Sequence, residues 1–279
     1  MKLTSVTPTG RLTLSFEVFP PKTDDRYAAV EEAARQIAAL RPDFMSVTYG
    51  AGGGTSKNTA GIAADLQNKY GTPVLAHLTC VSSTKQFVSD MIEVYHEKGI
   101  ENIMALRGDI PKEGRSVFDY DHASQLIYDI KSKDENICIG GACYPEGHVE
   151  CERPSEDLLH LKEKVDAGCS FLTTQMFFDN NTLYNFLYRL REKGIEVPVL
   201  PGIMPITNKK QVSRSVALSG ATIPQHFRMM VDRFGDDPVK MAQAGVIYAT
   251  EQIIDLISNG VTHIHVYSMN KPEIAAGIM

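Results

Sequence analysis

One carboxylate stands near the end of the first apolar run of the chain, Glu17 within Thr13–Phe19. Side chains alternate between the two faces of a strand, so Glu17 shares a face with Ser15 and lies opposite Phe16 and Val18. We expect the apolar face to pack against helices and Glu17 to point into the mouth of a barrel. Burial beside apolar groups destabilises the charged carboxylate, which raises its pKa and suits it to general acid catalysis. The alternative is a structural glutamate paired with an arginine, and Glu17 alone does not decide between these roles.

Polar side chains also stand at the ends of five later apolar runs. These ends read Ser46-Val47-Thr48-Tyr49-Gly50, Ala76-His77-Leu78-Thr79, Leu106-Arg107-Gly108-Asp109, Cys143-Tyr144-Pro145-Glu146-Gly147-His148 and Thr174-Gln175-Met176-Phe177-Phe178-Asp179. Any one of these residues alone would be a loop cap or a satisfied core residue, but the ends of successive barrel strands meet on one rim. We therefore expect one site, in which the Arg107 fork and the Lys164 point charge would hold a phosphorylated ligand.

The sequence gives weaker support to metal binding and to nucleophilic catalysis. Cys138, Cys143, His148 and Cys151 are close in sequence, but their spacing matches no C-x₂-C zinc pattern, so we predict no metal site. A serine nucleophile is also disfavoured, because the chain has no G-x-S-x-G elbow.

The elements that must position these residues alternate regularly along the chain. The predicted strands are nearly continuously apolar, as in strands buried on both faces: Thr13–Phe19, Phe44–Tyr49, Val74–Thr79, Asn102–Arg107, Cys138–Tyr144, Phe171–Phe178, Val197–Met204 and His263–Met269. The predicted helices are Asp24–Leu40, Lys57–Tyr70, Thr84–Lys98, His122–Lys133, Pro154–Ala167, Asn180–Lys193 and Lys209–Leu218, with two or three more within Thr222–Asn259.

Eight such units are typical of a (β/α)₈ barrel of about 250 residues. The competing architecture is a doubly wound sheet. The glycine cluster after the second strand lacks the third glycine of the dinucleotide-binding fingerprint, because Thr55 stands there. We predict an α/β fold in which residues 1–279 form one domain, a (β/α)₈ TIM barrel.

The composition excludes several classes of protein. The chain has 279 residues, 43% of them hydrophobic, and 28 Lys and Arg against 34 Asp and Glu give a net charge of −6. Without a basic stripe we expect no nucleic-acid partner. No apolar stretch is long enough for a signal peptide or a membrane span, and five cysteines do not make a disulfide scaffold. We expect a cytoplasmic protein with no membrane association.

Eight segments together resemble the methylenetetrahydrofolate reductase family, in the family's order and over nearly the whole chain. They are Ser15–Lys22, Ser46–Ala51, Ala76–Cys80, Ala105–Asp109, Tyr144–His148, Lys164–Gly168, Thr174–Asp179 and Pro201–Pro205. Several are common peptides individually, but their combination is specific. The length resembles the bacterial catalytic barrel without the regulatory domain of eukaryotic members.

The resemblance implies an FAD-dependent barrel that reduces 5,10-methylenetetrahydrofolate to 5-methyltetrahydrofolate. It implies ping-pong chemistry, in which NADH or NADPH reduces the flavin and leaves before the folate binds. Glu17 resembles the general acid that protonates N10 of the folate, and Asp109 the carboxylate between flavin and pterin. FAD-contact positions are matched by Thr48, Tyr49, Ala51, His77, Arg107, Gly108, Asp109, Ala123, Tyr144, His148, Asp157, His160 and Lys164. Folate-binding positions are matched by Glu17, Asp109, Gln175, Gln211 and Lys271.

Three residues depart from the family pattern. Ser215 stands where some bacterial members carry a phenylalanine that packs against nicotinamide or folate, Glu163 where a basic FAD contact is expected, and Cys151 where a small alanine is expected. Ser215 keeps open an alternative, an FAD- and folate-binding subunit that receives its electrons from a partner protein. Another flavin barrel, of the proline-dehydrogenase type, would share the architecture without the stretch at residues 16–21. Besides its reduced-folate substrate, we expect the chain to associate as a homo-oligomer.

Overall fold

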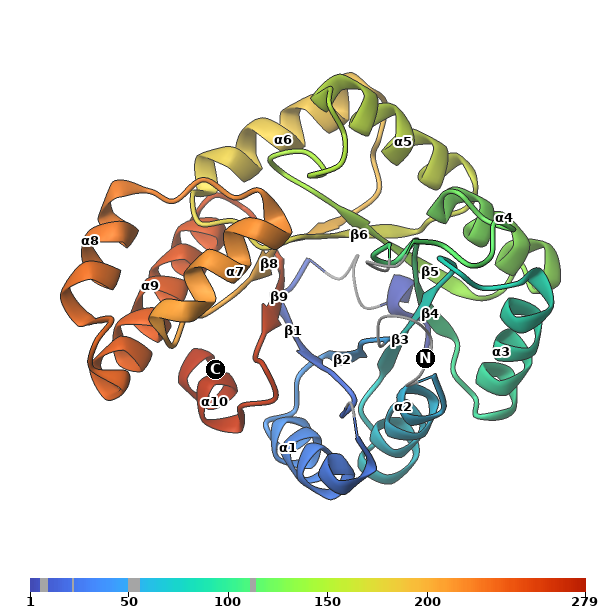
Figure 1. The fold of residues 1–279 in the computed structure, drawn as a ribbon, viewed down its shortest axis with the longest axis horizontal. Coiled ribbons are helices and arrows are strands. Elements are labelled where there is room, and N and C mark those ends of the chain that lie inside the picture. Colours follow the sequence, from blue (N-terminus) through green and yellow to red (C-terminus); the bar gives the residue numbers. More distant parts are fainter. Residues whose placement is uncertain (6–9, 22, 50–55, 111–113) are drawn as a thin grey trace.

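A single sheet of parallel strands closes on itself and is surrounded by helices (Figure 1). The structure is a computed structural model, and it describes residues 1–5, 10–21, 23–49, 56–110 and 114–279. The predicted barrel is confirmed in this part of the chain.

All eight predicted strands are present, most of them shorter than expected at the carboxyl end. They are β1 (Thr13–Val18), β2 (Phe44–Val47), β3 (Val74–Thr79), β4 (Asn102–Leu106), β5 (Cys138–Cys143), β6 (Phe171–Thr174), the seventh as β7 (Val199–Leu200) and β8 (Gly202–Ile203), and β9 (His263–Tyr267). The residues that follow each strand lie in loops at the carboxyl end of the barrel, its rim, where their side chains can face a ligand.

Helices follow the strands in the expected order. They are α1 (Tyr27–Ala39), α2 (Ser56–Tyr70), α3 (Lys85–Glu97), α4 (Ala123–Lys133), α5 (Pro154–Asp166), α6 (Asn180–Glu192), α7 (Lys209–Ser219), α8 (Gln225–Phe234), α9 (Pro238–Ser258) and α10 (Pro272–Ile278), with short 3₁₀ turns η1 (Leu3–Ser5) and η2 (Asp24–Arg26). The interval Thr222–Asn259 holds two of them, and α10 was not predicted. None of the described helices is long and apolar enough to cross a membrane.

The barrel closes through its divided seventh strand. β7 pairs with β6 and β8 pairs with β9, with Pro201 between them. Proline has no amide hydrogen to give to a ladder, so the strand changes partner there. The carbonyl of Pro201 still accepts a hydrogen bond from the amide of His265 at 2.9 Å.

Gly202 makes this closure possible. A Cβ at this position would lie 2.3 Å from the carbonyl oxygen of Thr174 and 2.6 Å from the ring of Tyr267. Its amide also donates to the Thr174 hydroxyl at 2.8 Å. The backbone of β8 therefore lies so close to Thr174 of β6 and to Tyr267 of β9 that only glycine fits at this position.

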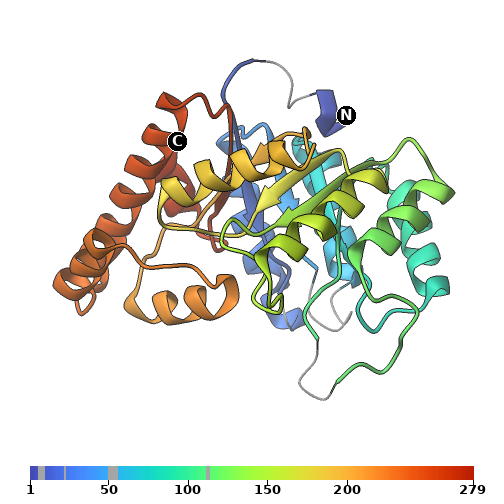
Figure 2. The ribbon, with the colours of Figure 1, turned by 90° about the horizontal axis from the view of Figure 1, so that it is seen from above.

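Apolar residues fill the amino-terminal half of the barrel interior. Inward-facing side chains from six strands form one buried cluster: Phe44, Leu75, Met104, Cys138, Phe171 and Leu200. Leu3 of η1 joins this cluster, and its amide donates to Oδ1 of Asn102 at 2.8 Å. Figure 2 shows η1 at one end of the barrel and the described part of the connection that follows β4, drawn in green, at the other. Because the first end is filled, the space for a ligand lies at the carboxyl ends of the strands.

Candidate active site

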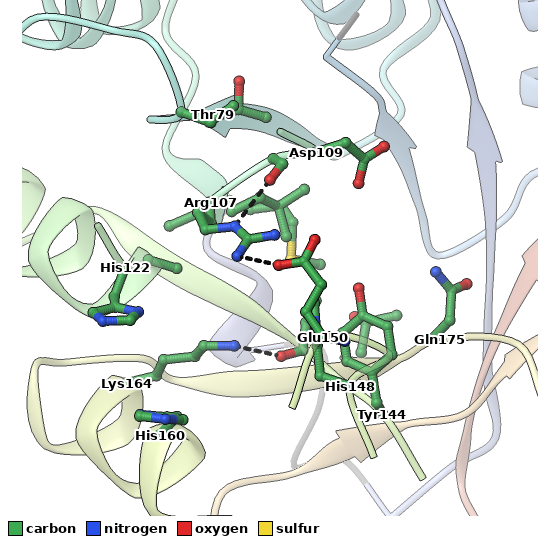
Figure 3. A pocket seen from close by; sticks show the side chains of 18 of the residues that line it. Thr79, Arg107, Asp109, His122, Tyr144, His148, Glu150, His160, Lys164 and Gln175 are labelled. Carbon is green, nitrogen blue, oxygen red and sulfur yellow. Dashed lines mark hydrogen bonds and ion pairs between the residues drawn. The ribbon is translucent and has the colours of Figure 1, made fainter. Parts of the chain in front are cut away.

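A cavity of about 770 Å³ lies at the carboxyl ends of the strands (Figure 3). Most of the residues that we predicted for the site line it: Glu17, Thr48, Tyr49, His77, Arg107, Gly108, Asp109, Ala123, Tyr144, His148, Asp157, His160, Lys164 and Gln175. Ala51 lies outside the described residues. Gln211 and Lys271 are not among the lining residues. The polar ends of six successive units do converge on one rim.

Glu17 faces polar groups of the neighbouring strands, as strand parity requires. Its Oε2 lies 3.6 Å from Nε2 of His77 and 3.7 Å from Nε2 of His265, and it accepts a hydrogen bond from the Ser46 hydroxyl at 3.3 Å. The side chain is 21% exposed. Phe16 and Val18 are fully buried in the outer core between strands and helices.

These neighbours make our expectation of a raised pKa wrong for the protein without ligands. Burial does raise the pKa of Glu17, but its attraction to His265 and His77 and the hydrogen bond from the Ser46 hydroxyl together outweigh it, so the pKa is lowered. Burial lowers the pKa of His77 to about 4, so this imidazole is neutral at pH 7.

Arg107 is held at the end of β4 by its own loop and by an acid. Its Nε donates to the carbonyl of Gly108 at 3.1 Å, and its Nη1 lies 2.7 Å from Oε2 of Glu150. Gly108 has φ +88°, and a Cβ there would lie 2.8 Å from Val81. Glycine thus lets the chain turn tightly over β3 and present Arg107 and Asp109 to the cavity.

Lys164 reaches the same space from α5. Its ammonium donates to the carbonyl of Ala142 at 3.0 Å, and burial lowers its pKa. Beside it the rings of His122 and His160 stack with centroids 5.5 Å apart. Figure 3 shows both cations on the side of the cavity that carries these two rings. This side has the charge and flat surfaces that suit a phosphate and an aromatic base.

The loop after β5 forms one wall of the cavity. Tyr144 and His148 pack edge to face, with centroids 4.5 Å apart, and the His148 amide donates to Asp157 at 3.2 Å. Burial raises the pKa of Tyr144 to about 12, so the phenol stays protonated. The hydrogen bond between the His148 amide and Asp157 thereby joins this loop to α5.

Asp109 and Gln175 lie on the side of the cavity away from the stacked histidines (Figure 3). Gln175 follows β6, and its Oε1 accepts a hydrogen bond from the Met176 amide at 3.0 Å, which leaves its amide NH₂ group for a ligand. A carboxylate and an amide donor at this side can together recognise a polar ring with both donor and acceptor edges.

Gln211 and Lys271 are brought together elsewhere, beside the barrel rim. Lys271 Nζ donates to the Thr207 hydroxyl at 2.9 Å, and that hydroxyl donates to Oε1 of Gln211 at 3.2 Å. The same Oε1 caps the start of α7 by accepting from the amide of Asn208 at 3.1 Å. In this structure Gln211 is therefore occupied with a helix cap.

The three departures from the family pattern have distinct surroundings. Ser215 is 1% exposed, and its hydroxyl contacts Sδ of Met204 at 3.7 Å. Glu163 lines the cavity next to His160, 3.4 Å away, and Cys151 lines it with its thiol directed to the carbonyl of Arg153. Among the described residues no group of three or more His, Cys, Asp or Glu could hold a metal ion.

Two residues around Glu17 were missed from the sequence, His265 and Tyr267, and Ser46 was named only as part of a strand end. A usable signal was present, because β9 reads His263-Ile264-His265-Val266-Tyr267, an alternation that places the three polar rings on one face. The hydroxyl of the partly buried Tyr267 donates to the carbonyl of Thr174 at 2.6 Å and so ties β9 to β6.

Comparison with known proteins agrees with the geometry of the site. The family model for methylenetetrahydrofolate reductase matches residues 2–279. The 5,10-methylenetetrahydrofolate reductase of Pectobacterium carotovorum is 34% identical over 96% of this chain and 89% of its own, and that of Escherichia coli is 34% identical over 96% and 90%. The methylenetetrahydrofolate reductase (NADH) 1 of Arabidopsis thaliana is 33% identical over the whole chain, which spans 49% of the plant protein.

A solved structure has the same fold at low sequence identity. It is an uncharacterised protein from Clostridium thermocellum described as binding two copies of 5-methyl-5,6,7,8-tetrahydrofolic acid. It matches 99% of this chain and 95% of its own with a TM-score of 0.67 and 14% identity.

Proposed function

The chain belongs to the methylenetetrahydrofolate reductase family, and from that premise we propose that it reduces 5,10-methylenetetrahydrofolate to 5-methyltetrahydrofolate with bound FAD and with NADH or NADPH as donor. The observation that carries the proposal is the shared cavity that Glu17 lines, with Asp109 and Gln175 at one side and Arg107 and Lys164 at the other. The Clostridium thermocellum barrel of the same fold, which binds a methylated tetrahydrofolate, supports a folate as ligand.

The residues of the cavity fit FAD. Two buried polar atoms that line it, Nε2 of His77 and Oγ1 of Thr173, have no hydrogen-bond partner among the described residues, and buried polar groups are normally satisfied. Arg107 and Lys164 suit the pyrophosphate, and the stacked His122 and His160 offer flat surfaces beside them. A volume of about 770 Å³ is within the range of cofactor sites. When bound, FAD supplies hydride transfer.

The residues of this chain would bind and orient the folate and would protonate it. Gln175 and Asp109 hold the pterin edge, and Glu17 gives a proton to N10 of the folate. The bond between N10 and the methylene carbon then breaks with its electron pair going to N10, and the lone pair of N5 makes that carbon an electrophilic iminium. The pKa of Glu17 is lowered when the cavity contains no ligand. Ligands that cover the cavity remove its remaining hydration, which favours the neutral acid that this step needs.

An absorbance spectrum of the purified protein tests the proposal. We expect a yellow protein whose flavin absorbance is bleached by anaerobic NADH or NADPH and returns when methylenetetrahydrofolate is added. A protein that stays colourless after incubation with FAD would contradict it.

A second candidate function is a subunit that takes electrons from a partner protein. The observation that favours it is Ser215, which is buried against Met204 and offers no aromatic ring to a nicotinamide. In the same experiment this subunit would be yellow and would not be bleached by either nicotinamide coenzyme.

Removal of the Lys164 ammonium should weaken flavin binding. Loss of one charge-assisted contact costs about 1.5–3 kcal/mol, so Lys164→Ala is expected to bind FAD about ten- to hundredfold more weakly and to recover activity with added FAD. Quenching of flavin fluorescence measures the affinity. Lys162→Ala is the matched control, because Lys162 lies on the same helix and pairs with Asp166. Equal affinities of the two variants would remove Lys164 from the cofactor site.

A further inference from the structure

One face of α9 lies against the connections that follow β6 and β8. This face carries Gly245, Tyr248, Gln252 and Asp255, which recur at the spacing of helical turns. A Cβ at Gly245 would lie 1.9 Å from the carbonyl oxygen of Ile206, so the backbone of the helix lies directly on the connection after β8. The side chains of Tyr248 and Gln252 reach the connection after β6 instead.

The connection after β6 receives two hydrogen bonds from α9. Residues 175–179 lie beyond the end of β6, so their backbone groups need partners outside the strand ladder. The carbonyl of Phe177 accepts from Nε2 of Gln252 at 3.1 Å, and the carbonyl of Phe178 accepts from the Tyr248 hydroxyl at 2.7 Å. Gln252 is 7% exposed, and burial raises the pKa of Tyr248 to about 12, so its hydroxyl keeps its hydrogen. Two adjacent carbonyls are thus held by two side chains one helical turn apart.

Gln175 stands at the start of the connection that α9 holds. Its backbone amide donates to the carbonyl of Cys143 at 2.7 Å, and its Oε1 accepts from the amide of Met176 at 3.0 Å. The direction of its NH₂ group therefore depends on the backbone at Met176, which lies between Gln175 and the carbonyl of Phe177. A shift of Phe177 would turn this NH₂ group relative to the cavity that Gln175 lines (Figure 3).

We propose that Tyr248 and Gln252 are positioning residues, which keep Gln175 in the orientation that binds the folate. This inference rests on the proposed function, because it takes Gln175 as a ligand of the pterin edge. Tyr248 and Gln252 are not themselves among the residues that line the cavity, and they act through the backbone of Phe177 and Phe178. Their removal should therefore weaken folate binding and leave flavin binding unchanged.

Tyr248→Phe removes one of the two donors and keeps the ring, which packs edge-on against Phe227 with centroids 4.8 Å apart. Tyr184→Phe is the matched control, because the Tyr184 hydroxyl donates to Oδ2 of Asp255 at 2.7 Å and joins α9 to α6. Calorimetric titration of the flavin-loaded protein with 5-methyltetrahydrofolate measures the dissociation constant. We expect Tyr248→Phe to bind about three- to tenfold more weakly, the effect of one hydrogen bond, and Tyr184→Phe to bind like the wild type. Gln252→Met should weaken binding in the same way, and all three variants should keep wild-type affinity for FAD.

Replacement of Gln175 shows whether Tyr248 acts through it. In a Gln175→Ala background, Tyr248→Phe should cause no further loss of folate affinity, because the side chain that Tyr248 positions is absent. A further loss of the same size in that background overturns the inference. Equal folate affinities of Tyr248→Phe and Tyr184→Phe also overturn it.

Hydrogen exchange distinguishes failure of this inference from failure of the proposed function. In the protein without folate, the amides of residues 175–178 should exchange faster in Tyr248→Phe than in the wild type and in Tyr184→Phe, as measured by mass spectrometry of peptides that cover them. Exchange at the wild-type rate in Tyr248→Phe overturns the inference. If exchange is faster as expected but the wild-type protein binds no 5-methyltetrahydrofolate, the proposed function fails, while the coupling of α9 to Gln175 stands.

Discussion

Glu17→Gln should lose the folate half-reaction and keep the other. Glutamine preserves the shape of the side chain and donates a hydrogen bond, but it does not transfer a proton. General acids contribute about 10²–10⁴-fold, so reoxidation of the reduced flavin by methylenetetrahydrofolate is expected to slow by that factor. Hydride transfer from the nicotinamide requires no proton for the folate, so flavin reduction should proceed at nearly the wild-type rate. Anaerobic stopped-flow traces at the flavin absorbance measure each half-reaction.

Glu152→Gln is the control for the change in charge, since Glu152 is an exposed carboxylate that lines the same cavity. It should leave both half-reactions unchanged. Wild-type reoxidation in Glu17→Gln would make Glu17 a structural carboxylate. Loss of both half-reactions together would mean that Glu17 maintains the geometry of the site.

Gly202→Ala should have the largest effect on stability. The added methyl group would lie 2.3 Å from the carbonyl oxygen of Thr174, a backbone atom that cannot move without opening the sheet where β8 closes it. Overpacking of a core usually costs about 1–3 kcal/mol, and with backbone in contact we expect about 3 kcal/mol or more. Urea denaturation followed by circular dichroism measures the loss.

Gly61→Ala is its counterpart on α2. There the nearest atom to a new Cβ is the hydroxyl of Tyr27 at 3.2 Å, the end of a side chain that can shift. Alanine is also the better helix former by about 1 kcal/mol, so this variant should be as stable as the wild type or more so. A Gly202→Ala protein of wild-type stability would show that the seventh strand tolerates a wider spacing.

The barrel was predictable because its strands are short, apolar and regularly spaced. The division of the seventh strand was not predicted, although Pro201 lies in the middle of the run 197–204 and proline does not continue a central ladder. The short helix α10 was also missed. It begins at Pro272, after Met269 and Asn270 with positive φ, a turn between non-glycine residues that no local composition announces.

The part of the site that is formed by residues at strand ends was predictable from the sequence. Parity and the order of the strands placed Glu17, His77, Arg107 and Gln175 on one rim, and all four line the cavity. The electrostatic setting of Glu17 was not predictable in the same way. Its pKa depends on residues from other strands, Ser46 and His265 among them, whose approach is decided by register and not by neighbouring sequence.

The five thiols of the chain differ in how far they are buried. Because of this difference, an electrophile should react with one of them in preference to the other four. Cys80, Cys138, Cys143 and Cys169 are buried, and burial raises the pKa of each, so few of these sulfurs are present as reactive thiolates. Cys151 alone is partly exposed, on the wall of the cavity. An alkylating reagent therefore meets one usable sulfur, at the place where a bound ligand would shield it. The chain thus carries a built-in chemical handle for following occupancy of its own site.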